Sequence, residues 1–135
     1  MTDPAESTMP TSQPLTRRLR AHLQRIAVRG EPVTYRAVAE ALALKPPHTI
    51  HQVAQALEGL MREDAANDRP FIAALVISRA RGGLPAPGFF DMARELGRFD
   101  GEPSGQDAAT AHAAMVAAAV AFWSAAGLPE AGTAA

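Results

Sequence analysis

The spacing of apolar residues predicts a helix near the start of the chain. Four apolar residues recur at three- and four-residue intervals, which places them on one helical face: Leu15, Leu19, Leu23 and Ile26. Gly30 follows where such a helix would end. We therefore expect a first helix over about 14–28, capped by Thr11 or Ser12.

The next stretch, Glu31–Leu60, predicts two helices joined by a tight turn. Pro32-Val33 favours a short strand, and Thr34 can cap a helix from Tyr35 to about Leu44. The Pro46-Pro47 pair would end that helix, because proline lacks an amide hydrogen. A pair of short helices joined by a turn is typical of a helix-turn-helix.

The second helix of this pair is expected to run from Thr49 to about Asp64. Thr49 and Gln52 have the spacing of a capping box. The apolar residues of this segment fall on one face, which we expect to be buried: Ile50, Val53, Leu57, Leu60 and Met61.

The C-terminal half predicts one strand and two further helices. Phe71–Ser78 is a short apolar run typical of a buried strand, and Arg79–Gly88 follows as a loop rich in glycine and proline. A short helix is expected over Phe89–Leu96. The last helix should run from a cap at Asp107 to Ala126, with four inward anchors: Met115, Val116, Phe122 and Trp123.

These elements predict a mainly α (α+β) protein with a single domain over 14–126. Its core would be winged helix-turn-helix-like, with a short β element and an added C-terminal helix. The start of the chain, 1–13, is rich in Pro, Ser and Thr and is expected to be a disordered lead-in. Residues 127–135 are expected to form a flexible tail.

Composition narrows the classes of chemistry that the chain can carry. Apolar residues make up 47% and charged residues 20% of 135 residues, as in an ordinary globular protein. The chain has no cysteine, which excludes disulfides, thiolate metal sites and a cysteine nucleophile. The first residues lack the basic and apolar regions of a secretory signal, so we expect a cytoplasmic protein.

Charge is distributed unevenly along the chain. Residues 15–62 carry eight Lys and Arg against three acids, whereas 63–135 carry five Arg against nine acids. A basic half can present one face to an anion such as DNA, although a solvated basic face would give the same pattern. The residues that we expect to contact nucleic acid combine this charge with the start of the second helix of the pair and with the loop: Arg17, Arg18, Arg20, Arg25, Tyr35, Lys45, Thr49, His51, Gln52, Gln55, Arg79 and Arg81.

The last helix has two readings. It carries no formal charge from Ala108 onward, which raises the question of a membrane span. Alanine dominates it, and Thr110, His112 and Ser124 interrupt it, so close packing on neighbouring helices is favoured and no membrane contact is expected. The same helix over 107–126 could instead contact a protein partner or a second copy.

Two segments resemble the winged-helix domain of alkylguanine alkyltransferases and their catalytically inactive relatives. Val33–Ala39, VTYRAVA, is similar to the VTYGEVA-like segment of that family, and Gln52–Leu57, QVAQAL, to its RAVGxAL-like segment. The resemblance covers about sixty residues and implies a DNA-binding winged helix in which Tyr35 contacts the DNA backbone. The family's PCHRV strand would fall on Phe71–Ser78, with Ala73–Ile77 at the reactive motif.

Departures from that family bear on activity. The nucleophilic cysteine is missing, so alkyl transfer has no residue to carry it. The arginine that displaces the base in that family would fall on His51. The resemblance therefore supports the fold more than a reaction.

A second resemblance lies further along the chain. Pro70–Ile77 and Gly83–Gly97 are similar to a segment of uncharacterised bacterial proteins that reads PxxSALVVxxxTGxPGxGFFELARxLG. It implies no activity, but it indicates that the LPAPGFF loop has a defined structure.

Other chemistry has little support in the sequence. His48 and His51 could approach each other, but no third ligand completes a metal site, and no serine lies in a nucleophile elbow. We therefore predict a non-enzymatic module without a cofactor that binds nucleic acid, most plausibly double-stranded DNA, or has a regulatory role. The alternative is a protein–protein adaptor that uses the winged-helix core as scaffold.

Overall fold

The computed structural model describes residues 14–126 and is mainly helical. The elements follow in this order: α2 (Leu15–Arg29), β1 (Val33–Thr34), α3 (Tyr35–Ala41), α4 (Thr49–Ala66), the 3₁₀ helix η2 (Ile72–Leu75), β2 (Val76–Ile77), the 3₁₀ helix η3 (Arg79–Arg81), α5 (Pro87–Glu95) and α6 (Gly105–Ala126). The predicted lead-in over 1–13, the caps Thr11 and Ser12, and the predicted tail over 127–135 lie outside the described residues.

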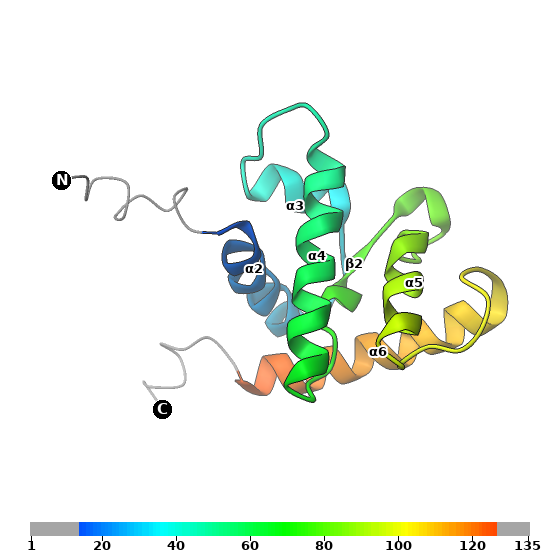
Figure 1. Ribbon diagram of the computed structural model, residues 1–135. Coiled ribbons are helices and arrows are strands. Elements are labelled where there is room, and N and C mark those ends of the chain that lie inside the picture. The colour runs from blue at the N-terminus through cyan, green and yellow to red at the C-terminus, as the bar shows by residue number, and fades with distance from the viewer. Residues whose placement is uncertain (1–13, 127–135) are drawn as a thin grey trace.

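Helix α4 lies at the centre of the molecule, with α2 and α5 on either side of it (Figure 1). The two strands pair in parallel, Val33 with Val76 and Thr34 with Ile77, and so join the start of α3 to the end of η2. Helix α6 crosses the end of the molecule opposite the α3–α4 turn and packs on α2 and η2 (Figure 1). The two ends of α4 therefore face different surroundings.

The first two helices agree with the sequence pattern except at their ends. Helix α2 begins and ends one residue later than predicted, and Gly30 ends it in the left-handed conformation with φ 81°. Helix α3 stops at Ala41, three residues before the predicted end. The reason is a left-handed turn at Ala43, φ 53°, which redirects the chain before the proline pair is reached.

Helix α4 begins at Thr49 as predicted, but the predicted capping box is wrong. His48 is the residue before the helix and adopts the left-handed conformation with φ 65°, so Thr49 is already the first helical residue. No side chain caps this helix. The side-chain amide of Gln52 instead donates to the backbone carbonyls of Lys45 and Pro47, each at 3.1 Å, and so holds the turn closed.

The predicted strand over Phe71–Ser78 is wrong for most of its length. Residues 72–75 form a 3₁₀ helix, and only Val76 and Ile77 are extended. Every residue from Phe71 to Val76 is buried, so the run shows no alternation that could distinguish a strand from a helix. The buried Asp64 carboxylate accepts from the amide of Ile72 at 3.1 Å, which favours helical geometry at that point.

Three further expectations need correction. Helix α6 starts at Gly105, which places Asp107 in its first turn instead of at its cap. Ile50 and Phe122, predicted to face inward, are 46% and 40% exposed. Val53 and Trp123, predicted on the same faces, are buried as expected. Ile50 lies in the first turn of α4, at the edge of the core, and the Phe122 ring packs against Trp123 with ring centroids 4.9 Å apart.

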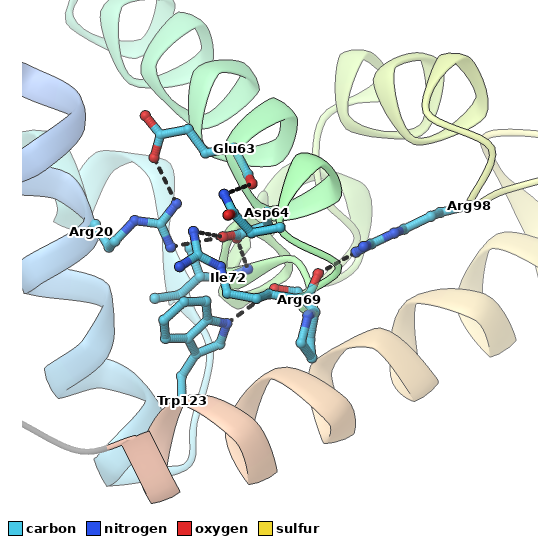
Figure 2. A network of polar contacts seen from close by, with 9 residues as sticks. Arg20, Glu63, Asp64, Arg69, Ile72, Arg98 and Trp123 are labelled. Carbon is cyan, nitrogen blue, oxygen red and sulfur yellow. Dashed lines mark hydrogen bonds and ion pairs between the residues drawn. The ribbon is translucent and has the colours of Figure 1, made fainter.

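A buried polar cluster joins α2, the end of α4 and α6 (Figure 2). The Asp64 carboxylate is fully buried and lies 2.9 Å from a guanidinium nitrogen of Arg20 and 3.1 Å from one of Arg69. Both guanidiniums lie over the ring of Trp123, at 5.1 and 5.2 Å from its centroid. The indole of Trp123 donates to the carbonyl of Pro70 at 3.1 Å, so α6 is tied to the core through one side chain.

Helix α6 stands apart from the other described helices in its composition. It is long and apolar enough to cross a membrane, with a mean hydropathy of 1.4 over Gly105–Ala125, and 22% of its most apolar window is buried. Core helices of soluble proteins can have the same composition. The prediction that the chain makes no membrane contact stays a prediction.

Candidate nucleic-acid interface

A concave surface lies between α3, the start of α4 and the segment after β2. We call this surface the basic groove; its volume is about 610 Å³, and its lining residues include Tyr35, Arg36, Ile50, Ser78, Arg79 and Arg81. A second hollow of about 270 Å³ shares Arg36 and Ile50 with it and extends the surface towards Glu40 and Leu44. The lining of the basic groove includes three arginines and no acidic side chain. Such a surface favours an anionic ligand.

The far wall of the basic groove is a closed loop over Ser78–Leu84. The amide of Ser78 donates to the carbonyl of Leu84 at 2.8 Å, and these two residues form an antiparallel bridge. Gly82 and Gly83 close the loop with φ 68° and 93°, a conformation that side chains disfavour. The loop carries Arg79 and Arg81 in the short helix η3.

Tyr35 fixes the loop to the helix pair. Its ring is 6% exposed, and its hydroxyl oxygen accepts from the amide of Ala86 at 2.9 Å. Burial is the main cause that raises the pKa of this phenol. Tyr35 therefore lines the basic groove mainly as a positioning residue, whereas the sequence predicted a direct contact with nucleic acid.

The start of α4 forms the near wall of the basic groove. Its first turn contains no acidic residue and no side-chain cap, so the positive end of the helix is not neutralised by its own side chains. Ile50, His51 and Gln55 are exposed here, and Thr49 is half-buried. Helix α6 lies at the opposite end of the molecule (Figure 1), which leaves this end of α4 uncovered within the described chain.

The arginines of α2 do not join the basic groove. Arg18 donates to the carbonyl of Leu42, and Arg20 contacts both Glu63 and Asp64 at 2.9 Å. Arg17 lies beside Arg20 and Glu63 in a separate hollow. Glu63 lies about 21 Å along α4 from Thr49, since each residue of a helix adds about 1.5 Å. The α2 arginines predicted to bind nucleic acid therefore do not form one surface with the basic groove. Arg18 and Arg20 pack against other elements, and Arg17 lies near the far end of α4.

The remaining residues predicted to bind nucleic acid differ in their exposure and in their hydrogen-bond partners. Arg25 and Lys45 are exposed, Lys45 within the α3–α4 turn next to the start of α4. Gln52 is occupied by its two bonds to the turn. Arg81 donates to the carbonyl of Pro103, which leaves part of its guanidinium for other contacts.

The sequence analysis missed Arg36, Ile50 and Ser78 as lining residues. Arg36 directly follows Tyr35 and is exposed at the centre of the groove. Its position on the face opposite Val38 could have been read from helical spacing, because residues two apart point to different sides. Ile50 was assigned to the core, but it lies in the first turn of α4, where it lines the groove.

No candidate metal site is found among the described residues. Within residues 14–126, no three side chains of the metal-binding types His, Cys, Asp and Glu come together as a candidate site. The basic groove supplies cations, hydroxyls and an apolar patch, which suit the binding of an anionic ligand.

The chain was compared with family models, with curated proteins and with solved structures. None of these comparisons finds a match to it.

Proposed function

We propose that this protein is a non-enzymatic DNA-binding module of winged-helix type. The observation that carries the proposal is the basic groove, which joins the uncovered start of α4 to the arginines of the Ser78–Leu84 loop in one concave surface. A helix start and a basic loop on one face suit a duplex, whose major groove can receive the helix while the loop lies against phosphates.

The arrangement of elements is compatible with a winged helix. Helices α2, α3 and α4 pack on one another, and α3 and α4 are joined by the short turn over 42–48. The Ser78–Leu84 loop, closed by its own bridge, takes the place of a wing. The parallel pairing of β1 and β2 fixes this loop next to α3.

The roles of individual residues follow from their exposure. Arg36, Arg79 and the free part of Arg81 would contact phosphates, and Lys45 would add a fourth contact from the turn. His51 and Gln55 are exposed on the first turns of α4 and would reach base edges. Arg18, Arg20, Tyr35 and Gln52 would act indirectly, by holding the elements in place.

Salt dependence of duplex binding tests this proposal. With about four phosphate contacts, the logarithm of the association constant should fall with the logarithm of salt concentration with a slope between about −3 and −4. Fluorescence anisotropy with a labelled duplex of mixed sequence measures this slope. A slope near zero, or no binding at about 50 mM salt, would contradict the proposal. The predicted alternative, a protein–protein adaptor that contacts its partner through α6, would then become the favoured function.

A further inference from the structure

Helix α6 turns an apolar face away from the domain. Its buried positions are Ala108, His112, Ala119 and Trp123, and they pack towards the core. The opposite side is made of small residues and one large one, all exposed: Ala109, Thr110, Ala113, Ala114, Ala117, Ala118, Ala121, Phe122 and Ala125. Residues 108–126 carry no Asp, Glu, Lys or Arg, so no fixed charge opposes the approach of another apolar surface.

A hollow of about 480 Å³ opens beside this face. Ala114, Met115 and Ala118 form its wall on α6, and Pro70 and Phe71 are among the residues on its other side. Arg98 also borders the hollow, but its guanidinium lies 4.4 Å from the Phe71 ring centroid and donates to the carbonyl of Arg69. Asp68 and Arg69 border the hollow as well, and Arg69 pairs with the buried Asp64 at 3.1 Å. Both arginines at the hollow therefore already have partners, and the rest of its lining apart from Asp68 is apolar.

The exposed Phe122 and the hollow lie on the same side of α6. Phe122 follows Met115 by seven residues, which at about 100° per residue brings the two within about 20° of each other around the helix. Ala118 lies one turn from Phe122 on that side. The face thus combines a projecting aromatic ring with a hollow that has room for one, about one to two helical turns away.

We propose that the outward face of α6 binds a second copy of this chain. In a two-fold symmetric pair the α6 helices run antiparallel and cross near Ala118, so that Phe122 of each copy enters the hollow of the other beside Ala114. A single projection and a single hollow on one face satisfy each other only in a symmetric pair, where the same patch serves both subunits. The small residues at the crossing allow the two helices to approach closely.

The available area limits the strength of this contact. Helix α6 is about 33 Å long and about 10 Å wide. Half of the lateral surface of such a cylinder, the part that faces away from the domain, is roughly 500 Å² per copy. This is less than the ~800 Å² per partner of a standard interface, and the filled hollows add to it. We therefore expect a weak, transient dimer, as is typical of interfaces below the standard size. The proposal is independent of DNA binding, because the basic groove and the hollow beside α6 share no lining residue.

Cysteine cross-linking tests the crossing point, since the natural chain contains no cysteine. Ala118→Cys should form a disulfide-linked dimer under mild oxidation, because the two residues meet where the helices cross and a disulfide needs Cα atoms within about 7 Å. Ala125→Cys is the matched control, because Ala125 is also exposed and lies within about 20° of Ala118 around the helix. In the proposed pair its two copies lie about 21 Å apart along the helices and should not cross-link. Equal cross-linking at both positions, or none at Ala118→Cys, would overturn the proposal.

Sedimentation of the cysteine-free protein measures the dimer itself. Phe122→Ala should weaken self-association at least tenfold, as loss of a central aromatic anchor does. Val28→Ala removes another exposed large apolar residue, 53% exposed on α2, and should leave self-association unchanged. Ala118→Lys, which places two like charges at the crossing without touching the core, should also give a monomer. A monomeric wild-type protein, including one that floats with phosphatidylcholine vesicles, would contradict a second copy as the occupant.

Discussion

At the scale of single residues, Asp64 has the largest structural role among the charged side chains. It is fully buried between two guanidiniums and also accepts from the amide of Ile72 (Figure 2). Glu63, its neighbour, contacts the same Arg20 but is 53% exposed. The two acids therefore offer a matched comparison of a buried and an exposed partner.

We expect Asp64→Asn to lower the free energy of unfolding by roughly 3 kcal/mol, because it leaves Arg69 without its counter-charge and Arg20 with only the exposed Glu63. Glu63→Gln should cost less than about 1 kcal/mol, since an exposed ion pair contributes little. Urea unfolding followed by circular dichroism measures both. An equal decrease in the free energy of unfolding of the two variants would contradict the claim that the buried Asp64 stabilises the fold more than the exposed Glu63.

His112 links stability to pH. Burial lowers its pKa, and its Nε2 lies 2.9 Å from the carbonyl of Ala74. The unfolded chain therefore binds a proton more readily, so the free energy of unfolding should fall as pH decreases through about 6.5, the ordinary histidine value. His112→Gln keeps a donor for Ala74 and should reduce this fall in the free energy of unfolding.

His22 contributes in the same direction, because burial lowers its pKa and Arg25 and Arg29 add to the effect. The free energy of unfolding of the double variant, His112→Gln with His22→Gln, should therefore depend even less on pH. An unchanged pH profile in His112→Gln would contradict this assignment.

At the scale of elements, the bond from Ala86 to Tyr35 holds the Ser78–Leu84 loop and the start of α5 near α3. Tyr35→Phe removes the acceptor and should cost about 1 kcal/mol. The exchange of the Ala86 amide with solvent should then speed up by about fivefold, and DNA binding should weaken. Hydrogen exchange measured by NMR gives the rate.

Thr34→Ala provides the matched control for Tyr35→Phe. It removes the cap that Thr34 gives to Ala37 at the start of α3, at a similar cost of about 1 kcal/mol. It should leave the Ala86 amide protected. Faster exchange of Ala86 in both variants would attribute the effect to general destabilisation.

The secondary-structure elements were predicted well where apolar residues recur with the period of a helix. Helix α2 and most of α4 have apolar residues every three or four positions, and both occur within two residues of the expected bounds. The run over Phe71–Ser78 is apolar throughout, and its 3₁₀ start depends partly on a carboxylate from α4. That contact lies eight residues back and cannot be read from local pattern.

At the scale of the whole molecule, the described chain has two different ends. The α3–α4 turn and the start of α4 lie at one end, and α6 crosses the other (Figure 1). The basic groove begins at the first end, and its Arg81 donates to the carbonyl of Pro103, just before α6. The sequence suggested a single basic half that includes α2. The structure instead uses Arg18 and Arg20 for packing and places Arg17 near the far end of α4.

The site was therefore predictable only in part. Tyr35, Arg79 and Arg81 were identified and do come together, whereas Arg36 and Ile50 were missed. The sequence shows which residues are charged, but it does not show which end of α4 the charged residues of α2 lie beside. The separation of Arg20 from Thr49 depends on how α2 and α4 pack, and this information is tertiary.

Charge reversal tests the central claim, that the basic groove binds duplex DNA, most directly. Two double variants with the same net change are compared by fluorescence anisotropy at about 50 mM salt. Arg36→Glu with Arg79→Glu reverses two charges in the groove, whereas Arg17→Glu with Arg25→Glu reverses two exposed charges on α2. We predict that the first pair weakens binding at least about tenfold and that the second changes it by less than about threefold. Equal losses in the two pairs, or a greater loss in the α2 pair, would contradict the assignment of the basic groove as the DNA-binding surface.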